Sequence, residues 1–588
     1  MKRPLVFYSI STAIGCLSTM EFFNDFIVGM TIAVLFFIIY FFTLDRKFFI
    51  INAMFFILAS FSFMCYFNMY LDTNEKIRVV QKKSYYFIGN FKGRKVILTG
   101  KTEKLEEGSR IEAYGSFEKN NDFSRGIIGR YTIKNYKPLK HDMIYYIYEY
   151  KKFIYNKFKN KIGEDRTALV MGICYGDTQY LTSDQNQEFQ KLGVVHAVSV
   201  SGFHMAILYQ FIECILGFKA AVIFSMLYVV FTGMSAATVR SFIMIFIFKM
   251  SKVFFREYDS LSSLSLAAII LIMAKPYNVV DIGFSLSFLA TLGIILYYKK
   301  LSMKFYMLPK KLNESISITL ASQIYSMPYI AFTIQNFSYG FILGNLFLLP
   351  LYSAIVVLGN VALIFSFLKQ AFDLITIPLN MVLTASEGAN SIILKFCPDI
   401  IYLSYEQGII MLLLYMSYVL YKSGYKKIKY LPAAVLIAVF IQNYSFITEI
   451  TFLNFKSGEA VILNNGSKKF MMCNYDSFSS KWVTNIRDSM NVDKIVTNPS
   501  QNYIYKLNNN SFLNINPENK DELIVKLCNN NEEINFVLDK QYESDIKTSD
   551  RNLIYIPKLR SDSSMSNGDV LDKSCSYVII FNRAIKIK

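Results

Sequence analysis

The sequence predicts a polytopic α-helical integral membrane protein with a small β-barrel after its first helices and a soluble tail at its C-terminal end. Hydrophobic residues make up 53% of the 588 residues, and the mean hydropathy is +0.31. Both values exceed what a soluble globular protein usually carries. Two stretches, residues 75–138 and 448–588, instead alternate short strand-like runs with polar turns. The chain is therefore expected to hold a membrane body that one small domain interrupts and another follows.

The net charge is strongly positive, at +18 from 62 Lys and Arg against 44 Asp and Glu. The basic residues are spread over loops and termini, which fits both the positive-inside rule for membrane proteins and a polyanion that passes nearby. The eight cysteines contain no CxxC pair. Neither a zinc ribbon nor a disulfide framework is therefore indicated.

Residues 1–70 are predicted to form the N-terminal transmembrane helices, because apolar runs cover 5–20, 26–44 and 48–67. The first run is short but lacks a small-residue cleavage site, so we expect a first helix rather than a signal peptide. The basic residues beside these runs are Lys2, Arg3, Arg46 and Lys47. By the positive-inside rule they place the start of the chain in the cytoplasm and residue 70 outside.

Residues 75–138 are predicted to form a small β-barrel of the OB type, because short alternating runs are joined by glycine- and asparagine-containing turns. Basic residues here outnumber acidic ones. Aromatic faces and cations are what single-stranded nucleic acid binds, and the candidates are Tyr85, Tyr86, Phe91, Arg94 and Lys95. The competing interpretation, that the aromatic residues form the barrel core, is the more common role of such side chains.

Residues 141–162 combine apolar and lysine positions in the pattern of a basic amphipathic helix. Such a helix lies at a membrane surface with its lysines toward phosphate headgroups. We expect interfacial anchoring here in preference to contact with DNA.

Residues 166–447 are predicted to be the membrane body, with about ten helices, some of them short or re-entrant. The apolar segments lie near 203–217, 219–235, 237–255, 261–274, 278–298, 314–334, 338–369, 371–395, 404–421 and 430–447. Clustered lysines at 299–300, 310–311 and 422–429 are expected in cytoplasmic loops, which would leave the tail outside.

Residues 193–207 are the first candidate for function, because this apolar stretch carries two of the three histidines of the chain. His196 and His204 flank Ser199, Ser201 and Gly202. Polar groups and broken helices at membrane depth occur where they line a cavity or meet protein partners. A hydrogen-bonded core histidine is the competing interpretation. The spacing is not that of HExxH, so we predict no metal site.

Arg240 and Asp281 are ionisable residues within apolar segments of the membrane body. A charge at the bilayer centre costs about 3 kcal/mol even on insertion scales, so such a residue normally pairs or faces water. We expect Arg240 to pair with Asp281 or Asp177 when no anion is present. A purely structural ion pair and a phosphate-attracting cation both remain open.

Several motifs resemble those of the ComEC family, the inner channel proteins of bacterial DNA uptake. Leu169–Asp177 and Phe189–His204 look like the signature of its competence domain. The signature positions kept here are Gly176, Asp177, Gly193, His196, Ser201, Gly202 and His204. Thr232–Ser241, Lys275–Phe288 and Gly344–Asn345 with Pro350 are also similar in order and spacing.

The resemblance implies an OB-like domain near residues 75–138 and, at 448–588, a tail that resembles the metallo-β-lactamase domain of many relatives. Phe452–Ala460 looks like a decayed form of the opening strand of that domain. No histidine follows His204, so the HxHxDH cluster that would hold catalytic metals is missing from the sequence. We expect a degenerate α/β tail without nuclease activity, metal or cofactor.

The resemblance implies a multi-pass protein of the bacterial cell membrane that carries single-stranded DNA inward. Its expected partners are single-stranded DNA, membrane lipid, a DNA receptor and a cytoplasmic ATP-driven motor or helicase, since the chain has no P-loop. Whether it forms a homo-oligomer stays open.

Two alternatives to a DNA channel also remain. One is a membrane-embedded hydrolase with His196, Ser199 or Ser201, and Asp177 as a triad, although Ser-x-Ser-Gly is not a GxSxG elbow. The other is a transporter of another anionic polymer or a lipid-linked substrate.

Overall fold

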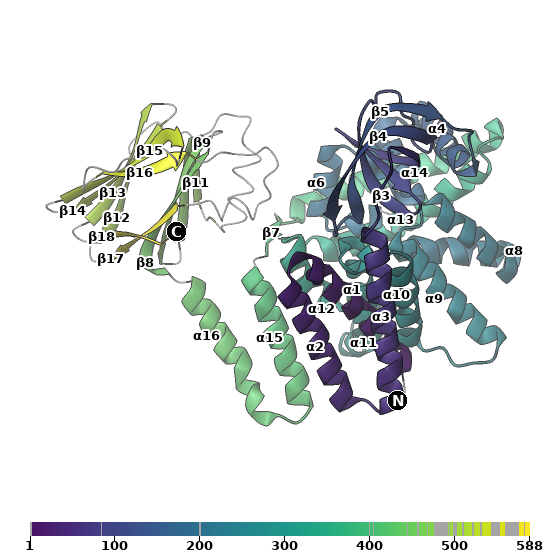
Figure 1. Ribbon diagram of the computed structural model, residues 1–588, viewed down its shortest axis with the longest axis horizontal. Coiled ribbons are helices and arrows are strands. Elements are labelled where there is room, and N and C mark those ends of the chain that lie inside the picture. The colour runs from purple at the N-terminus through teal and green to yellow at the C-terminus, as the bar shows by residue number, and fades with distance from the viewer. Residues whose placement is uncertain are drawn as a thin grey trace. The chain divides into compact units, whose positions relative to one another are not determined.

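A computed structural model of the chain divides it into two compact units, Met1–Thr333 with Phe337–Ile400, and Ile334–Asn336 with Ile401–Lys588 (Figure 1). Each unit is described by itself. The structure describes residues 3–83, 85–198, 201–398, 400–403, 405–443, 445–455, 458–466, 468–474, 492, 494–497, 503–508, 511–519, 522–529, 532–542, 553–558, 575–580 and 583–587.

Three long helices open the first unit: α1 (Pro4–Asn24), α2 (Phe26–Thr43) and α3 (Arg46–Phe67). The carboxylate of Asp25 caps α2 by accepting from the backbone N–H of Ile27 at 2.8 Å, as a good N-cap does. Gly15 lets α1 approach α3 closely, since a Cβ there would lie 2.5 Å from the carbonyl oxygen of Phe56. A buried hydrogen bond of 2.7 Å from Ser11 to Asn52 joins the same two helices.

A closed five-stranded barrel follows, which confirms the predicted small β-barrel. Its strands are β1 (Asn74–Lys82), β2 (Phe87–Phe91), β3 (Arg94–Gly100), β4 (Arg110–Asp122) and β5 (Ile127–Pro138), in the order β1-β2-β3-β5-β4. β3 and β5 run parallel and the other neighbours antiparallel. The core is formed by inward side chains of alternating positions, including Ile77, Val79, Val96, Leu98, Ile111 and Tyr131. In Figure 1 the barrel lies at the C-terminal end of α3.

Helix α4 (Met143–Ile162) connects the barrel to the membrane body. Its lysines do not all face lipid headgroups as predicted: the ammonium of Lys151 donates to the carbonyl of Tyr175 at 3.3 Å, and that of Lys157 donates to the carbonyl of Ser366. Lys161 pairs with Asp373 at 2.8 Å. Lys151 and Lys157 lie at the ends of α5 and α13, where exposed carbonyls favour cations. Lys159 also pairs with Glu164, at 2.9 Å, so four lysines of this helix hold protein partners.

The membrane body continues with α5 (Glu164–Tyr175), η1 (Thr178–Tyr180), α6 (Ser183–Lys191), α7 (Val195–Val198), α8 (Gly202–Phe231), α9 (Ala236–Val253), α10 (Ser260–Ala274), η2 (Pro276–Val279), α11 (Ile282–Lys304), α12 (Lys310–Thr333), β6 (Asn336–Phe337), α13 (Phe341–Ile364) and α14 (Lys369–Phe396). The segments expected near 203–217 and 219–235 are both helical and together make up α8, which is interrupted at Gly217, where a φ of 80° and a ψ of 177° are not helical. A glycine adopts this conformation without strain, so one helical segment ends there and a second begins.

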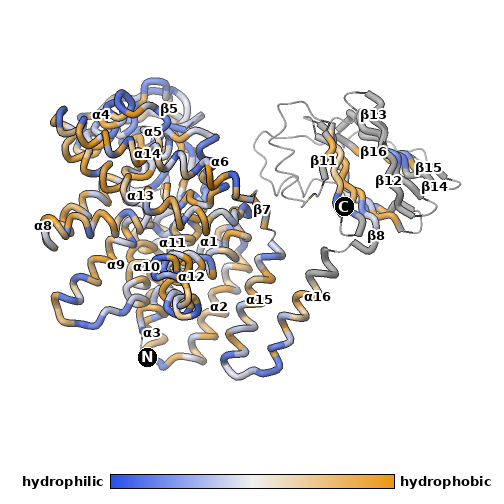
Figure 2. Tube along the Cα trace, turned by 180° about the vertical axis from the view of Figure 1, so that it is seen from behind, coloured by the Kyte–Doolittle hydropathy of each residue, from blue (hydrophilic) through white to orange (hydrophobic). Residues whose placement is uncertain are grey.

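Six helices of the described residues are long and apolar enough to cross a membrane, namely α1, α2, α3, α8, α11 and α13. Figure 2 shows hydrophobic residues along most of α8, α10, α11 and α13, and hydrophilic ones along α4 and the loop after α9. A multi-pass membrane protein is therefore confirmed.

The second unit starts with β7 (Ile401–Tyr402), α15 (Tyr405–Lys422), η3 (Lys426–Tyr430) and α16 (Leu431–Asn443). Beyond them, every regular element among the described residues is a strand. One sheet has the order β11-β10-β9-β8-β17-β18 and the other β12-β13-β14-β15-β16. The strands are β8 (Ser445–Phe455), β9 (Gly458–Gly466), β10 (Lys468–Asn474), β11 (Lys494–Thr497), β12 (Tyr503–Asn508), β13 (Ser511–Asn519), β14 (Glu522–Asn529), β15 (Glu532–Tyr542), β16 (Leu553–Lys558), β17 (Cys575–Ile580) and β18 (Arg583–Lys586).

The two sheets of the tail share one hydrophobic core. Phe452 and Tyr577 of the first sheet pack against Phe536 of the second, with ring centroids 5.0 Å and 5.3 Å from it. Two sheets that bury their inner faces against each other form a sandwich. The predicted strands of the tail are therefore present as a β-sandwich core.

Candidate functional site

The polar stretch of residues 193–207 breaks into a short helix and the start of a long one. Gly193, at φ 68°, turns the chain after α6. A Cβ on Gly193 would lie 2.6 Å from Cβ of Phe341, and one on Gly344 would lie 2.4 Å from the carbonyl oxygen of Leu192. Helix α13 therefore supports this turn through contacts that only glycines permit. Ser199 lies outside the described residues.

His204 is fully buried in the first turn of α8. Its Nδ1 accepts from the backbone N–H of Ser201 at 2.9 Å and lies 3.0 Å from the Ser201 hydroxyl. A donor on the backbone fixes Nδ1 as the acceptor, so the neutral ring carries its proton on Nε2. Among the described residues Nε2 has no hydrogen bond of acceptable geometry. The imidazole thus caps the helix with one nitrogen and leaves a buried donor on the other.

Arg240 of α9 reaches the start of α8 because residue 202 is glycine. A Cβ on Gly202 would lie 2.3 Å from Oγ of Ser241 and 2.8 Å from Nη2 of Arg240. The guanidinium donates to the hydroxyl of Thr291 on α11 and to that of Ser241 at 3.3 Å. Phe288 of α11 covers it, with the ring centroid 5.8 Å from Cζ. Three helices therefore meet at one buried cation, which is only 8% exposed.

The expected pairing of Arg240 with Asp281 or Asp177 is wrong for this structure. Within the part of the chain that the structure describes, Arg240 forms no ion pair, and its Nε has no hydrogen-bond partner. The two hydroxyls that it contacts are neutral groups. A buried guanidinium without a counter-ion carries an uncompensated desolvation cost, which makes this position attractive to an anion.

Asp281 serves α11 instead. Its carboxylate accepts from the backbone N–H of Phe284 at 2.7 Å and so caps the helix. Burial lowers the pKa of Lys95 in the barrel, and the positive charge of Lys275 lowers it further. The negative charge of Asp281 acts in the opposite direction and raises this pKa. Asp281 therefore belongs to the junction between the barrel and the membrane body.

Gly176 and Asp177 follow the last residue of α5, whereas His204 lies in the first turn of α8. Gly176 caps α5 in the left-handed region at φ 73°, the conformation in which glycine is favoured. Burial raises the pKa of Asp177, and nearby Lys151 lowers it in part. The carboxylate also accepts from the Gln179 amide at 3.3 Å. The neighbours of Asp177 are thus α4 and its own loop.

The remaining two channel candidates differ in exposure. The surface of His196 on α7 is accessible to solvent, yet protein surrounds the imidazole, and this burial lowers its pKa. Asn345 is buried in α13, where its amide donates to the hydroxyl of Thr319 at 3.4 Å while its Oδ1 has no partner among the described residues. An unsatisfied buried acceptor is costly, so Asn345 joins His204 and Arg240 as a buried polar residue with a free atom.

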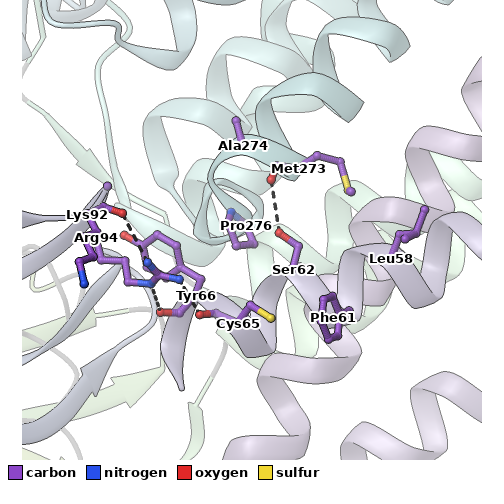
Figure 3. A pocket seen from close by; sticks show the side chains of 11 residues that line it. Leu58, Phe61, Ser62, Cys65, Tyr66, Lys92, Arg94, Met273, Ala274 and Pro276 are labelled. Atoms are coloured by element: carbon purple, nitrogen blue, oxygen red, sulfur yellow. Dashed lines mark hydrogen bonds between the residues drawn. The ribbon is translucent and has the colours of Figure 1, made fainter. Parts of the chain in front are cut away.

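The barrel candidates for DNA contact separate into exposed and structural side chains. Tyr85 is 95% exposed, and Tyr86 is half-buried. Phe91 is 1% exposed in the barrel core, so the core interpretation holds for it and it offers no face to a base. Arg94 donates to the carbonyls of Tyr66 at 2.9 Å and Cys65 at 2.8 Å, as Figure 3 shows.

Lys95, the last of the barrel candidates, lies against the membrane body. Its ammonium donates to the carbonyl of Arg125 at 3.0 Å and lies 4.6 Å from the ring centroid of Tyr277. Gly126 packs closely on the ring of the same tyrosine, since a Cβ built on this glycine would lie 2.5 Å from the ring. The hydroxyl of Tyr66 donates to the Gly126 carbonyl at 2.9 Å. Lys95 and Arg94 thus hold the barrel on the helices.

The structure assembles Ser201, Gly202, His204 and Arg240 of the predicted residues into one site, at the junction of α8, α9 and α11. Sequence reasoning missed three residues that complete it, Ser241, Phe288 and Thr291. Hydroxyl residues within apolar helices were the available signal, since such side chains hydrogen-bond between helices in membranes. The register that directs them toward Arg240 appears only in the fold.

Among the described residues, no three His, Cys, Asp or Glu side chains gather as metal ligands would. Oxygen, nitrogen or thiolate ligands must converge on a metal ion from several side chains. The prediction that the chain binds no metal stays a prediction.

Comparison with known proteins identifies the membrane body. A family model described as Competence protein matches residues 173–422. The chain is 26% identical over 273 residues to ComE operon protein 3 of Bacillus subtilis (strain 168), which covers 44% of this chain and 35% of that protein. It is 25% identical over 218 residues to an uncharacterized protein of Aquifex aeolicus (strain VF5), covering 35% of this chain and 50% of that protein.

The chain therefore spans half or less of the length of these curated relatives, and no solved structure matches it. The matched residues 173–422 contain His204, Arg240 and the three helices that meet there. The family match and the similarity to ComE operon protein 3 support a ComEC-family competence protein and confirm the resemblance that the sequence predicted.

Proposed function

We propose that the chain is a channel that carries single-stranded DNA across the bacterial cytoplasmic membrane during natural transformation. The match to competence proteins supports a role in DNA uptake. The observation that carries the channel assignment is Arg240, a buried cation whose described neighbours are hydroxyls and an aromatic ring. A cation that lacks a counter-ion in the empty protein is suited to bind a passing phosphate.

The start of α8 adds to the attraction for phosphate. The first backbone N–H groups of a helix carry partial positive charge and bind anions. Gly202 brings this end to within van der Waals distance of the guanidinium. In the proposed mechanism a phosphate accepts from Arg240, whose Nε has no partner among the described residues, and the Ser241 and Thr291 hydroxyls hold the guanidinium in place. His204 offers a second donor at Nε2, which has no hydrogen bond of good geometry among the described residues although the backbone of Ala197 lies near the imidazole.

The barrel is proposed to be OB-like and to deliver the strand to the membrane body. In OB-folds the face of strands 2 and 3 and the loops after strands 1 and 4 bind oligonucleotides. Here the loop after β1 exposes Tyr85, while the loop after β4 ends at Gly126, which packs on Tyr277. The strand register places the Tyr85 loop at the opposite end of β2 from Gly126, so a strand stacked on Tyr85 and Tyr86 would run along the barrel before it reached Tyr277.

The proposal also assigns partners and the role of the tail. Since the sequence lacks a P-loop, an ATP-driven motor or helicase in the cytoplasm would supply the energy, and a DNA receptor would supply the strand. The tail, residues 448–588, is proposed to be a degenerate metallo-β-lactamase-like domain without nuclease activity, because no histidine follows His204.

Uptake of labelled DNA tests the proposal directly. A strain that lacks the gene is complemented with the wild-type chain or with Arg240→Ala, and protected intracellular DNA is measured at matched membrane levels. We expect import with the wild-type chain and its loss with the variant. Import of DNA in the uncomplemented strain would contradict the proposed function.

A membrane-embedded hydrolase is the second candidate, because the Ser201 hydroxyl lies 3.0 Å from the His204 imidazole. A triad would need a carboxylate on the other ring nitrogen, yet Asp177 contacts Gln179 and lies near Lys151. Ser201→Ala separates the two: a hydrolase would lose its activity, whereas the channel would keep import. Competition of labelled DNA by other polyanions distinguishes a DNA channel from a transporter of another anionic polymer.

A further inference from the structure

A pocket of about 430 Å³ lies where α3, the turn between β2 and β3, and the end of α10 meet. Figure 3 shows its two unlike ends: the side chains of Lys92 and Arg94 lie at one end, and those of Leu58 and Phe61 at the other. All of these residues belong to the first unit. The site described above uses none of them.

The apolar end of the pocket belongs to a helix that can cross the membrane. Leu58 is 43% exposed and Phe61 64% exposed on α3, and they fall on one face, three residues apart. Met273, from the last turn of α10, lines the same pocket. Large apolar side chains that stay exposed on a membrane-spanning helix contact lipid chains.

The polar end carries two cations without carboxylate partners. Among the described residues no ion pair includes Lys92 or Arg94. Arg94 donates to the carbonyls of Tyr66, Cys65 and Lys92 at 2.9 Å, 2.8 Å and 3.4 Å, which leaves two of the five N–H groups of the guanidinium without a partner among the described residues. Lys92 is exposed beside it, with its ammonium 4.9 Å from the ring centroid of Phe91.

The turn between the two cations has open space beside Gly93. Gly93 lies between them at φ 87°, and a Cβ built on it meets no atom within 4 Å. The backbone N–H of Gly93 donates to Asn90 at 2.9 Å, which holds the turn in this open form. A phosphate group placed there would have a cation on either side.

We propose that this pocket binds one anionic phospholipid of the bilayer, with its phosphate between Lys92 and Arg94 and an acyl chain along Leu58 and Phe61. The two ends of the pocket match the two parts of a lipid: the cations complement an anionic headgroup, and the apolar side chains of α3 complement an acyl chain. α3 ends at Phe67, so its last turns lie where headgroups meet the hydrocarbon, and basic residues near a membrane surface contribute about 1 kcal/mol each toward anionic lipid. A nucleic acid strand would leave the apolar half unused.

A bound lipid at this position would join the barrel to the membrane. Its headgroup would contact the β2–β3 turn and its chain would contact α3, so the lipid would bridge the two elements that Arg94 already links. The inference does not depend on DNA transport, because it concerns a different surface and ligand.

A tryptophan placed in the pocket tests the proposal by fluorescence quenching. The sequence contains one tryptophan, Trp482, which Trp482→Phe removes, and Phe61→Trp then reports on the pocket. The full chain is reconstituted in phosphatidylcholine vesicles that contain equal fractions of brominated phosphatidylglycerol or of brominated phosphatidylcholine. We expect phosphatidylglycerol to quench at about 30-fold lower mole fraction, since two cations contribute about 1 kcal/mol each.

Two control variants separate this site from general lipid contact. Lys92→Gln should reduce the preference by about fivefold, as removal of one such contribution implies. Lys104→Gln, at an exposed lysine of the barrel outside the pocket, should leave it unchanged. Ile39→Trp on the exposed face of α2 should report equal quenching by both lipids.

Equal quenching by both lipids in the Phe61→Trp chain would overturn the proposal, and so would a preference that survives Lys92→Gln. A single-stranded oligonucleotide added to the vesicles provides the third outcome. If it reverses the quenching by phosphatidylglycerol through Lys92, the pocket binds nucleic acid and the lipid assignment is wrong.

Discussion

Two arginines of the membrane body differ in their partners and in their burial. Arg166 of α5 donates to both oxygens of Glu387 on α14, at 2.8 Å and 2.6 Å. Arg240 of α9, more deeply buried, contacts the hydroxyls of Thr291 and Ser241. A bidentate carboxylate pair is the common structural use of arginine. Arg166 thus joins two helices through an ion pair, whereas the lack of a carboxylate partner at Arg240 supports the proposal that it binds an anion.

A second ion pair supports this distinction. The ammonium of Lys249 on α9 lies 2.5 Å from a carboxylate oxygen of Glu213 on α8. The same two helices therefore neutralise one cation with a carboxylate and leave the other without one. Proximity of α8 and α9 alone does not explain the missing partner of Arg240.

The largest expected effect is that of Arg240→Ala, and Arg166→Ala is the matched control. A hydrogen bond to a charged group contributes about 1.5–3 kcal/mol, so Arg240→Ala should lower transformation frequency by roughly 10- to 100-fold. Arg166→Ala, which breaks a half-exposed pair, should change it little. Transformation frequency at matched membrane levels gives the comparison, and equal losses in both variants would remove the distinction. Arg240→Lys should keep part of the activity because the charge remains.

A methyl group at residue 202 sharpens the same comparison without changing any charge. Gly202→Ala adds a Cβ that would lie only 2.3 Å from Oγ of Ser241 and 2.8 Å from Nη2 of Arg240. We expect the guanidinium to move and DNA uptake to fall by about tenfold, corresponding to 1.4 kcal/mol. Gly388→Ala on α14, where no atom lies within 4 Å, is the control and should leave uptake intact. Normal uptake in Gly202→Ala would show that the close approach is not required.

The role of His204 can be divided between its two nitrogens. His204→Gln keeps an acceptor at the third position of the helix and can rebuild the capping box, but it loses the imidazole Nε2. We expect the glutamine variant to accumulate normally and to import less DNA than wild type. His204→Ala should also lose about 1 kcal/mol of capping. Full uptake in the glutamine variant would reduce His204 to a helix cap.

The smallest effect concerns the link between the barrel and α4. The hydrogen bond from Arg78 lowers the pKa of Asp142 to about 2. A carboxyl whose pKa is lowered by folding stabilises the protein above its unfolded value, and the contribution is lost as pH falls from about 4 through about 2. Asp142→Asn should therefore lower the free energy of unfolding by about 1 kcal/mol near neutral pH, after screening. Thermal melts should converge with wild type at low pH, and a constant difference would contradict the assignment.

The sequence was sufficient to predict the helices and the barrel, but not the residues that contact Arg240. Apolar runs and period-two alternation predicted the three N-terminal helices and the barrel, because such patterns follow from burial on one face. Arg240 was recognisable as a charge in an apolar helix. Its neighbour Thr291, 51 residues away, was not, because spacing along the chain does not give the register between helices. The lysines of α4 were misread for a related reason, since their helix-end partners depend on tertiary packing. Phe91 has the core role that the sequence analysis gave as the more common one.

Arg240 was expected to have a carboxylate partner. Because the structure shows no such partner among the described residues, a substitution of Arg240 gives the most direct test. On Arg240→Met, the hydroxyls of Thr291 and Ser241 keep their hydrogen bonds to the carbonyls of Ser287 and Ala237, both at 2.9 Å. Removing a buried unpaired charge should therefore stabilise the protein, by about 1–3 kcal/mol. The measurement is the thermal midpoint of purified Arg240→Met in detergent, together with its DNA uptake in cells. The account predicts a higher midpoint with uptake lost, and a lower midpoint would show that Arg240 holds the fold together.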